Sequence, residues 1–301
     1  MTNTPNGLRY ALAPFGAVIV AMIAITLGAT VAKKLFLVVG PAGTTALRLT
    51  LAAFMLSVAF RIWRVPVTRT MLRAAVPYGA SLGAMNLLFY MAIARIPLGI
   101  ALAFEFIGPL AVATFSSRHL RDFGWIALAV IGLRLLLPTQ TDGHPLDPDG
   151  IAFALVAGVF WGAYIIMGRR AGTVLGAEAP AFGMIVGALL AIPFGIVESG
   201  SGLLAPPVLG LALVVALLSS AIPYSLEMFA LRRLPTRTFG VLTSGEPAVG
   251  AVMGALFLQE KLPLAKWLGI AGIVGASIGT TIFSRSRRGT PDDEREHFLE
   301  N

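Results

Sequence analysis

The stretch AIARIPLGIALAFEFIGP, residues 92–109, returns 138 residues later as ALRRLPTRTFGVLTSGEP, residues 230–247. Further along, WIALAVIG (125–132) resembles WLGIAGIV (267–274). The match between the first two stretches includes an alanine, an arginine and two prolines at equivalent positions, namely Ala92, Arg95, Pro97 and Pro109 with Ala230, Arg233, Pro235 and Pro247. This pattern predicts that the chain contains an internal duplication.

The composition places the duplicated unit in a membrane. Of 301 residues, 56% are hydrophobic and 13% are charged, whereas soluble domains carry about 25% charged residues. The apolar residues form ten runs, each close to the ~20 residues that a helix needs to cross the bilayer: 11–32, 44–60, 74–94, 97–117, 123–138, 151–168, 179–197, 207–231, 238–259 and 267–283. We therefore predict an all-α membrane protein with ten transmembrane helices, and the lack of period-2 alternation argues against a barrel.

Basic residues predict the orientation of these helices. With the N-terminus inside, sixteen Lys and Arg residues fall in cytoplasmic segments and five fall outside. This bias predicts a multi-pass protein of the cytoplasmic membrane with both termini in the cytoplasm. It also explains the net charge of +8, so no nucleic-acid partner is needed.

The sequence has no cysteine, which excludes disulfides and thiolate metal sites.

The ten runs divide into two sets of five. We predict a first repeat over 1–138, a periplasmic linker loop over 139–149, a second repeat over 150–284 and a polar cytoplasmic tail over 285–301. Because five is odd, the second repeat must enter the membrane from the opposite side. Inverted repeats of this kind place substrate near the midplane, where the repeats meet.

Two prolines predict where that site lies. A helical proline removes the hydrogen bond to the carbonyl four residues earlier, so Pro109 frees the carbonyl of Glu105 and Pro247 frees that of Thr243. Glu105 is also the one ionisable residue of its run. A carboxylate in hydrocarbon is costly and usually faces a cavity. Glu105 is thus a candidate proton carrier or counter-charge for a cationic group, the alternative being a neutral acid that packs helices.

Other polar residues in the runs extend the candidate site. Glu246 directly precedes Pro247, where the helix is weakened. Asn86 and Tyr90 share a helix face, as do Trp161 and Tyr164, and Tyr224 lies on the face of Glu227. The alternatives are packing for Glu246 and for the aromatic residues, helix-to-helix bonding for Asn86, and an interfacial ion pair for Glu227. Arg48 either binds a carboxylate or extends its side chain to the interface.

Several absences limit the chemistry. The three histidines, His119, His144 and His297, fall outside the runs, and the chain has no nucleotide-binding motif. We therefore expect no cofactor, no metal and no enzymatic activity, although an intramembrane enzyme built from carboxylates alone stays open.

Gly79 and Gly83, four residues apart, favour close helix contact, within the chain or in a homodimer.

Five segments resemble a known family: TTALRL (44–49), SLGAMNLLFY (81–90), PLGIALAFEFIGPLAVATFSSR (97–118), IPYSLEMFALRRLPTRTFGVL (222–242) and EPAVGAV (246–252). They are similar to RhtA-type threonine/homoserine exporters of the EamA family, in the drug/metabolite transporter superfamily. The resemblance implies a bacterial inner-membrane exporter with two EamA repeats, driven by protons, for homoserine, threonine or analogues. A carrier of another metabolite or drug on the same fold is the alternative, and a passive channel is disfavoured because no polar stripe recurs.

Overall fold

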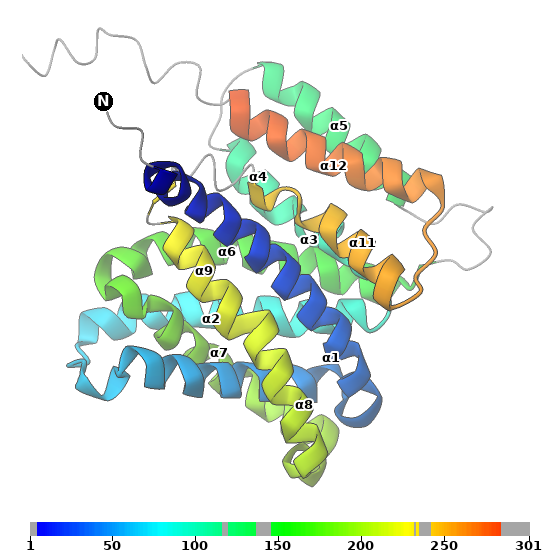
Figure 1. The fold of residues 1–301 in the computed structure, drawn as a ribbon. Helices are drawn as coiled ribbons and strands as arrows, with labels where there is room; N and C mark the ends of the chain where they lie inside the picture. Colours follow the sequence, from blue (N-terminus) through cyan, green and yellow to red (C-terminus); the bar gives the residue numbers. More distant parts are fainter. Residues whose placement is uncertain (1–4, 116–119, 137–145, 232, 235–241, 284–301) are drawn as a thin grey trace, which may run out of the picture.

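The computed structural model describes residues 5–115, 120–136, 146–231, 233–234 and 242–283, and there its regular elements are all helices (Figure 1). In chain order they are α1 (Pro5–Phe60), η1 (Ile62–Arg64), α2 (Arg69–Ile93), α3 (Leu98–Glu105), α4 (Ile107–Phe115), α5 (Leu120–Leu136), α6 (Pro148–Leu175), η2 (Gly176–Glu178), α7 (Ala179–Ser199), η3 (Gly200–Leu204), α8 (Pro206–Ala216), the π-helical turn η4 (Leu217–Ala221), α9 (Ile222–Leu231), α11 (Glu246–Phe257) and α12 (Leu264–Phe283).

Four stretches of described helix are long and apolar enough to cross a membrane: Ala13–Phe60, Arg69–Ile93, Pro148–Leu204 and Pro206–Glu227. Shorter apolar helices cover Leu98–Ala111, Glu246–Phe257 and Leu264–Ala276. The first and third long stretches have 48 and 57 residues, more than twice the ~20 that one crossing needs. The third contains both α6 and α7, joined at Gly176, where φ is 62°.

The first long stretch is broken at Gly40, where φ is 64° and ψ is 173°. Only glycine adopts such a backbone readily, and Pro41 follows. The helix restarts beneath the carboxylate of Glu198, whose Oε2 accepts hydrogen bonds from the backbone N–H groups of Ala42 (2.7 Å) and Gly43 (2.9 Å). These N–H groups have no partner within the restarted helix, so the carboxylate caps it. The first two predicted runs are therefore two helical segments of α1.

The segment between the predicted repeats is shorter than expected at its C-terminal end. We predicted a loop to residue 149, but α6 begins at Pro148. Proline suits the first position of a helix, and the Asp147 side chain accepts a hydrogen bond from the Asp149 N–H at 2.9 Å. Most of the predicted loop, and all residues after 283, lie outside the described residues.

The most extensive helix packing joins the two predicted repeats. Helix α1 packs on α7, α2 on α6, α3 on α11 and α5 on α12 (Figure 1). Small residues permit the close approaches: a side chain at Gly99 would meet the backbone of Ala251, and one at Gly83 would meet that of Gly187. Gly79 likewise faces α7. The predicted Gly79 and Gly83 motif thus packs helices within the chain.

One acidic side chain ties three segments together at an end of this bundle. Glu260, just after α11, forms an ion pair with Lys33 of α1, with Oε1 and Nζ 2.7 Å apart. Its other oxygen accepts a hydrogen bond from the N–H of Leu98, the first residue of α3, at 3.0 Å. Glu260 therefore links α1, α3 and the segment after α11.

A substitution on α6 tests how closely the helices approach. A Cβ atom on Gly158 would lie 2.5 Å from the carbonyl oxygen of Glu105, so Gly158→Ala must push α3 and α6 apart. Overpacking of this kind costs about 1–3 kcal/mol, and we expect a lower melting temperature for the purified protein in detergent. Gly172→Ala is the matched control on the same helix, since nothing lies within 4 Å of its added Cβ. Equal melting of both variants would contradict the packing.

Candidate functional site

Two helix breaks lie where the prolines predict them. Helix α3 ends at Glu105, and α4 begins after Phe106, three residues before Pro109. On the other side, residues 242 and 243 are helical, residues 244 and 245 form a turn, and α11 begins at Glu246, directly before Pro247. Both breaks occur in apolar helices, and each one has an acidic residue beside it. Backbone groups at a helix break in a membrane need a partner or a wet cavity.

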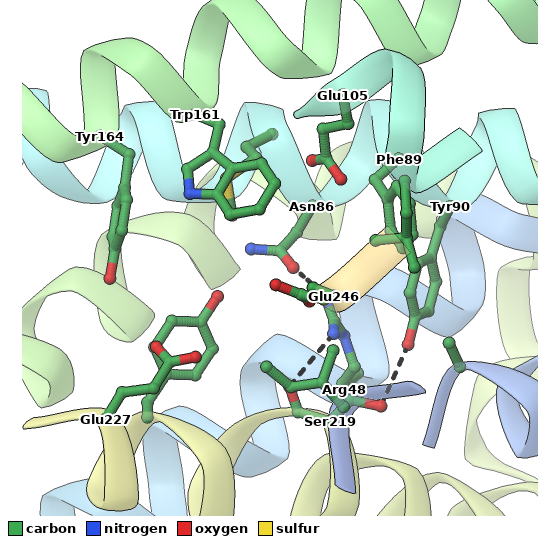
Figure 2. A pocket seen from close by; sticks show the side chains of 15 residues that line it. Arg48, Asn86, Phe89, Tyr90, Glu105, Trp161, Tyr164, Ser219, Glu227 and Glu246 are labelled. Carbon is green, nitrogen blue, oxygen red and sulfur yellow. Dashed lines mark hydrogen bonds between the residues drawn. The ribbon is translucent and has the colours of Figure 1, made fainter. Parts of the chain in front are cut away.

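A cavity lies beside these breaks (Figure 2). Its volume is about 70 Å³, and a buried water needs roughly 10–15 Å³ by this measure, so the cavity can hold several waters. Side chains from α1, α2, α3, α6, η4, α9 and α11 line it: Ile25, Ala29, Arg48, Met85, Asn86, Phe89, Tyr90, Leu102, Glu105, Trp161, Tyr164, Ser219, Tyr224, Glu227 and Glu246.

Nine of the ten predicted site residues are among these: Arg48, Asn86, Tyr90, Glu105, Trp161, Tyr164, Tyr224, Glu227 and Glu246. They come from both predicted repeats. Thr243 is the exception, because it lies half-buried in the turn before α11 and does not line the cavity. The structure thus brings nine of the predicted residues together around one cavity between the broken helices.

Arg48 is the cationic centre of the cavity. Its residue is 3% exposed, so the alternative that it extends to the interface is wrong. One terminal nitrogen donates a hydrogen bond to Asn86 Oδ1 and the other lies 3.5 Å from the Ser219 carbonyl oxygen, as Figure 2 shows. The guanidinium also lies over the ring of Tyr90, 4.3 Å from its centre. Its Nε is buried and has no hydrogen-bond partner in the described part of the chain.

Three carboxylic acids face the same cavity from three helices. Glu105 on α3 and Glu246 on α11 are 4% and 6% exposed, and Glu227 on α9 is half-buried. Arg48 forms no ion pair with these or with any other described carboxylate. Buried charges are normally paired, so a cation and three acids without mutual pairing suit a ligand that carries both signs. In the described residues, no three His, Cys, Asp or Glu side chains are grouped to hold a metal.

Aromatic rings form the end of the cavity away from Arg48. Trp161 and Tyr164 line it from α6, as predicted from their shared helix face. Trp161 meets Phe106 edge to face, with ring centres 5.2 Å apart, and Tyr164 stacks on Tyr78 at the same separation. These contacts hold the rings in place, so they give this end of the cavity a rigid apolar wall.

Ser219 is a polar lining residue that the sequence analysis missed. It lies in the π-helical turn η4, and its residue is 2% exposed. A sequence signal for it exists, because Pro223 stands four residues later and cannot donate to the Ser219 carbonyl. The apolar lining residues, such as Ile25 and Phe89, carry no such signal, since an apolar side chain is equally suited to lipid.

Comparison with known proteins agrees with this architecture. The model of the EamA-like transporter family matches residues 149–282. The threonine/homoserine exporters RhtA of Escherichia coli K12 and Salmonella typhimurium LT2 are each 48% identical over 272 residues, covering 90% of this chain and 92% of the exporter. The uncharacterized transporter YwfM of Bacillus subtilis is 27% identical over 64% of each chain.

A solved crystal structure shows the same fold. It aligns with a TM-score of 0.61 and 20% sequence identity, covering 91% of this chain and 99% of the other. The apolar helices indicate a membrane protein, and the family model and the exporter relatives indicate a transporter and not an enzyme. The chain belongs to the EamA-like transporter family.

Proposed function

We propose that this protein exports small neutral amino acids of the threonine/homoserine type across the bacterial cytoplasmic membrane. The observation that carries the proposal is the cavity, where buried Arg48 faces three carboxylic acids that it does not pair with. A zwitterion supplies the missing partners, because its carboxylate suits the arginine and its ammonium suits an acid. The threonine/homoserine exporters, 48% identical over most of the chain, support the same class of substrate.

The proposed architecture is ten transmembrane helices in two inverted repeats, with both termini in the cytoplasm. In the two proposed repeats, the start of α1 is equivalent to α6, and α2 is equivalent to α8. A twofold relation therefore makes the contact of α2 with α6 equivalent to the contact of α8 with α1, and both contacts are extensive. The cavity follows the same relation: Asn86 and Tyr224 both line it and are 138 residues apart, as are Phe89 and Glu227. Such a twofold relation supports alternating access by rocking of the repeats around the cavity.

Arg48 is the proposed carboxylate site. Asn86 accepts a hydrogen bond from one terminal nitrogen and the Ser219 carbonyl lies 3.5 Å from the other, while Nε has no hydrogen-bond partner among the described residues. Arginine presents its N–H groups in a planar fork that matches a carboxylate. A substrate carboxylate at the Nε side would therefore satisfy a buried donor that the protein leaves open.

Glu105 is the proposed ammonium and proton site, with Glu246 beside it. A carboxylate at this depth is stable when it carries a proton or meets a cation. If substrate ammonium and proton compete for Glu105, the site releases a proton when it binds substrate and takes one up when it is empty. That exchange couples export to the inward proton gradient.

Transport into everted membrane vesicles tests the proposal. In vesicles that hold this protein and are acid inside, radiolabelled homoserine and threonine are expected to accumulate above the external concentration, and a protonophore is expected to abolish the accumulation. Vesicles without the protein are the control. Equilibration without accumulation would indicate a channel, and a chemically changed label would indicate an intramembrane enzyme; either result contradicts the proposal.

Three aromatic residues of the cavity lining, Trp161, Tyr164 and Tyr224, favour one further candidate function. This candidate is a carrier of larger aromatic metabolites or drugs. A panel of unlabelled competitors in the same vesicles distinguishes the two. Inhibition of homoserine uptake by threonine supports the first candidate. Inhibition by aromatic amino acids alone supports the second.

A further inference from the structure

The π-helical turn η4 brings a serine to the Arg48 end of the cavity. Helix α8 ends at Ala216, and the chain passes through the wider turn over Leu217–Ala221 before α9. Because Pro223 has no N–H for the Ser219 carbonyl, the widened turn leaves this carbonyl beside Arg48. Turns of this type inside α-helices occur frequently at functional sites.

Gly28 of α1 keeps the space for the Ser219 side chain. A Cβ atom at residue 28 would collide with Ser219 Oγ, so the absence of a side chain there lets the hydroxyl sit between α1 and the cavity. Ser219 is 2% exposed and still lines the cavity. Its position is therefore set by packing on α1 as well as by the turn itself.

The polar groups around Ser219 are close but poorly paired. The Tyr90 hydroxyl donates to Ser219 Oγ at 3.4 Å, and an Arg48 nitrogen donates to the Ser219 carbonyl at 3.5 Å. Ordinary distances are about 2.5–3.0 Å for hydroxyl donors and 2.7–3.2 Å for nitrogen donors. In the described part of the chain, the Ser219 hydroxyl donates no hydrogen bond of its own. Buried hydroxyls normally have a full partner, so this cluster is incomplete without a ligand group.

We propose that Ser219 and Tyr90 recognise the side-chain hydroxyl of the substrate, and so make the carrier selective for hydroxy amino acids. This inference rests on the proposed function. Tyr90 and Ser219 both contact Arg48. A substrate whose carboxylate binds Arg48 would therefore have its β or γ carbon close to these two residues. A hydroxyl there accepts a hydrogen bond from Tyr90 and donates one to Ser219 Oγ, which replaces one long bond with two of ordinary length.

The deoxy analogue reveals why the pair gives selectivity. 2-Aminobutyrate has the carbon skeleton of homoserine and of threonine without the hydroxyl, so it leaves Tyr90 and Ser219 poorly paired. A buried polar group without its partner disfavours binding, and sites built for a hydroxyl reject analogues that lack one. For one neutral hydroxyl we expect a preference of roughly fivefold to tenfold for homoserine over 2-aminobutyrate, from the usual strength of such bonds.

The test measures the ratio of homoserine to 2-aminobutyrate uptake, as kcat/KM, for the full-length protein in proteoliposomes. Ser219→Ala and Tyr90→Phe are each expected to reduce the ratio to near one, mainly by raising the KM for homoserine. Tyr90→Phe keeps a ring beneath Arg48 and serves as the second variant should Ser219→Ala melt at a lower temperature. Ser225→Ala is the matched control, because the Ser225 hydroxyl is exposed, donates to the Ala221 carbonyl and does not line the cavity.

Each outcome has one meaning. A wild-type protein that carries both compounds equally well overturns the hydroxyl subsite and leaves amino-acid export intact. Equal losses for both compounds in the two variants also overturn it, because they indicate a structural role. A wild-type protein that carries neither compound overturns the proposed function itself.

Discussion

Replacement of Arg48 by lysine is expected to raise the KM for homoserine at least about tenfold, since hydrogen bonds to charged groups contribute about 1.5–3 kcal/mol. Lysine keeps the positive charge but loses the planar fork. It cannot contact Asn86, the Ser219 carbonyl and a substrate carboxylate in one fixed geometry, whereas arginine already holds the first two. Initial rates of labelled homoserine uptake into everted vesicles, over a range of concentrations, give the KM.

The control for this variant is Arg134→Lys, on α5. Arg134 is exposed in the structure and is not among the residues that line the cavity, so its replacement should leave the KM within about twofold, as is usual for surface substitutions. A KM for Arg48→Lys that equals the wild-type value would remove Arg48 from substrate recognition. The protein level in the vesicle membrane must be matched for all three proteins.

Replacement of Glu105 by glutamine is expected to abolish gradient-driven accumulation of homoserine. Glutamine keeps the size and the hydrogen-bonding carbonyl of the acid but cannot bind and release a proton. The exchange of proton for substrate ammonium therefore stops at a residue that is 4% exposed and faces the cavity. Uptake in vesicles that are acid inside is compared with uptake in vesicles without a pH difference, and the variant should give the same low level in both.

Asp149→Asn is the matched control, because Asp149 is an exposed acid in the first turn of α6. It should accumulate homoserine as the wild type does. Full accumulation by Glu105→Gln would transfer the coupling role to another acid, and the same measurement on Glu246→Gln and Glu227→Gln then shows which one. Loss in all three variants would mean that the acids act as a group.

The sequence predicted much of this site because apolar helices make polar residues conspicuous. Pro109 and Pro247 marked the two helix breaks, since the rule that proline frees a carbonyl needs no tertiary structure. Glu105, Glu246 and Arg48 stood out in the same way, because an ionisable residue in an apolar run needs a reason. The same rule applied to Pro223 would have pointed to Ser219.

Other parts of the site depend on distances that a sequence does not contain. Nothing in the one-dimensional pattern places Asn86 against Arg48, or Gly28 against Ser219, because these contacts join α1 with α2 and with η4. Thr243 shows the opposite error. Its carbonyl is four residues before Pro247, yet the turn before α11 keeps Thr243 away from the cavity lining. A proline of this kind therefore marks a break in a helix, but packing decides which residues at that break meet a ligand.

The carboxylate of Glu260 connects the start of the helix that carries Glu105 to α1. It holds Lys33 and the first N–H of α3 together, one helical turn beyond the cavity residues Ala29 and Leu102. Separation of α1 from α3 at this end would therefore require the Lys33 ion pair or the hydrogen bond to the Leu98 N–H to break. Because Glu105 is the last residue of the same eight-residue helix, a shift of α3 at Leu98 would also move this cavity residue.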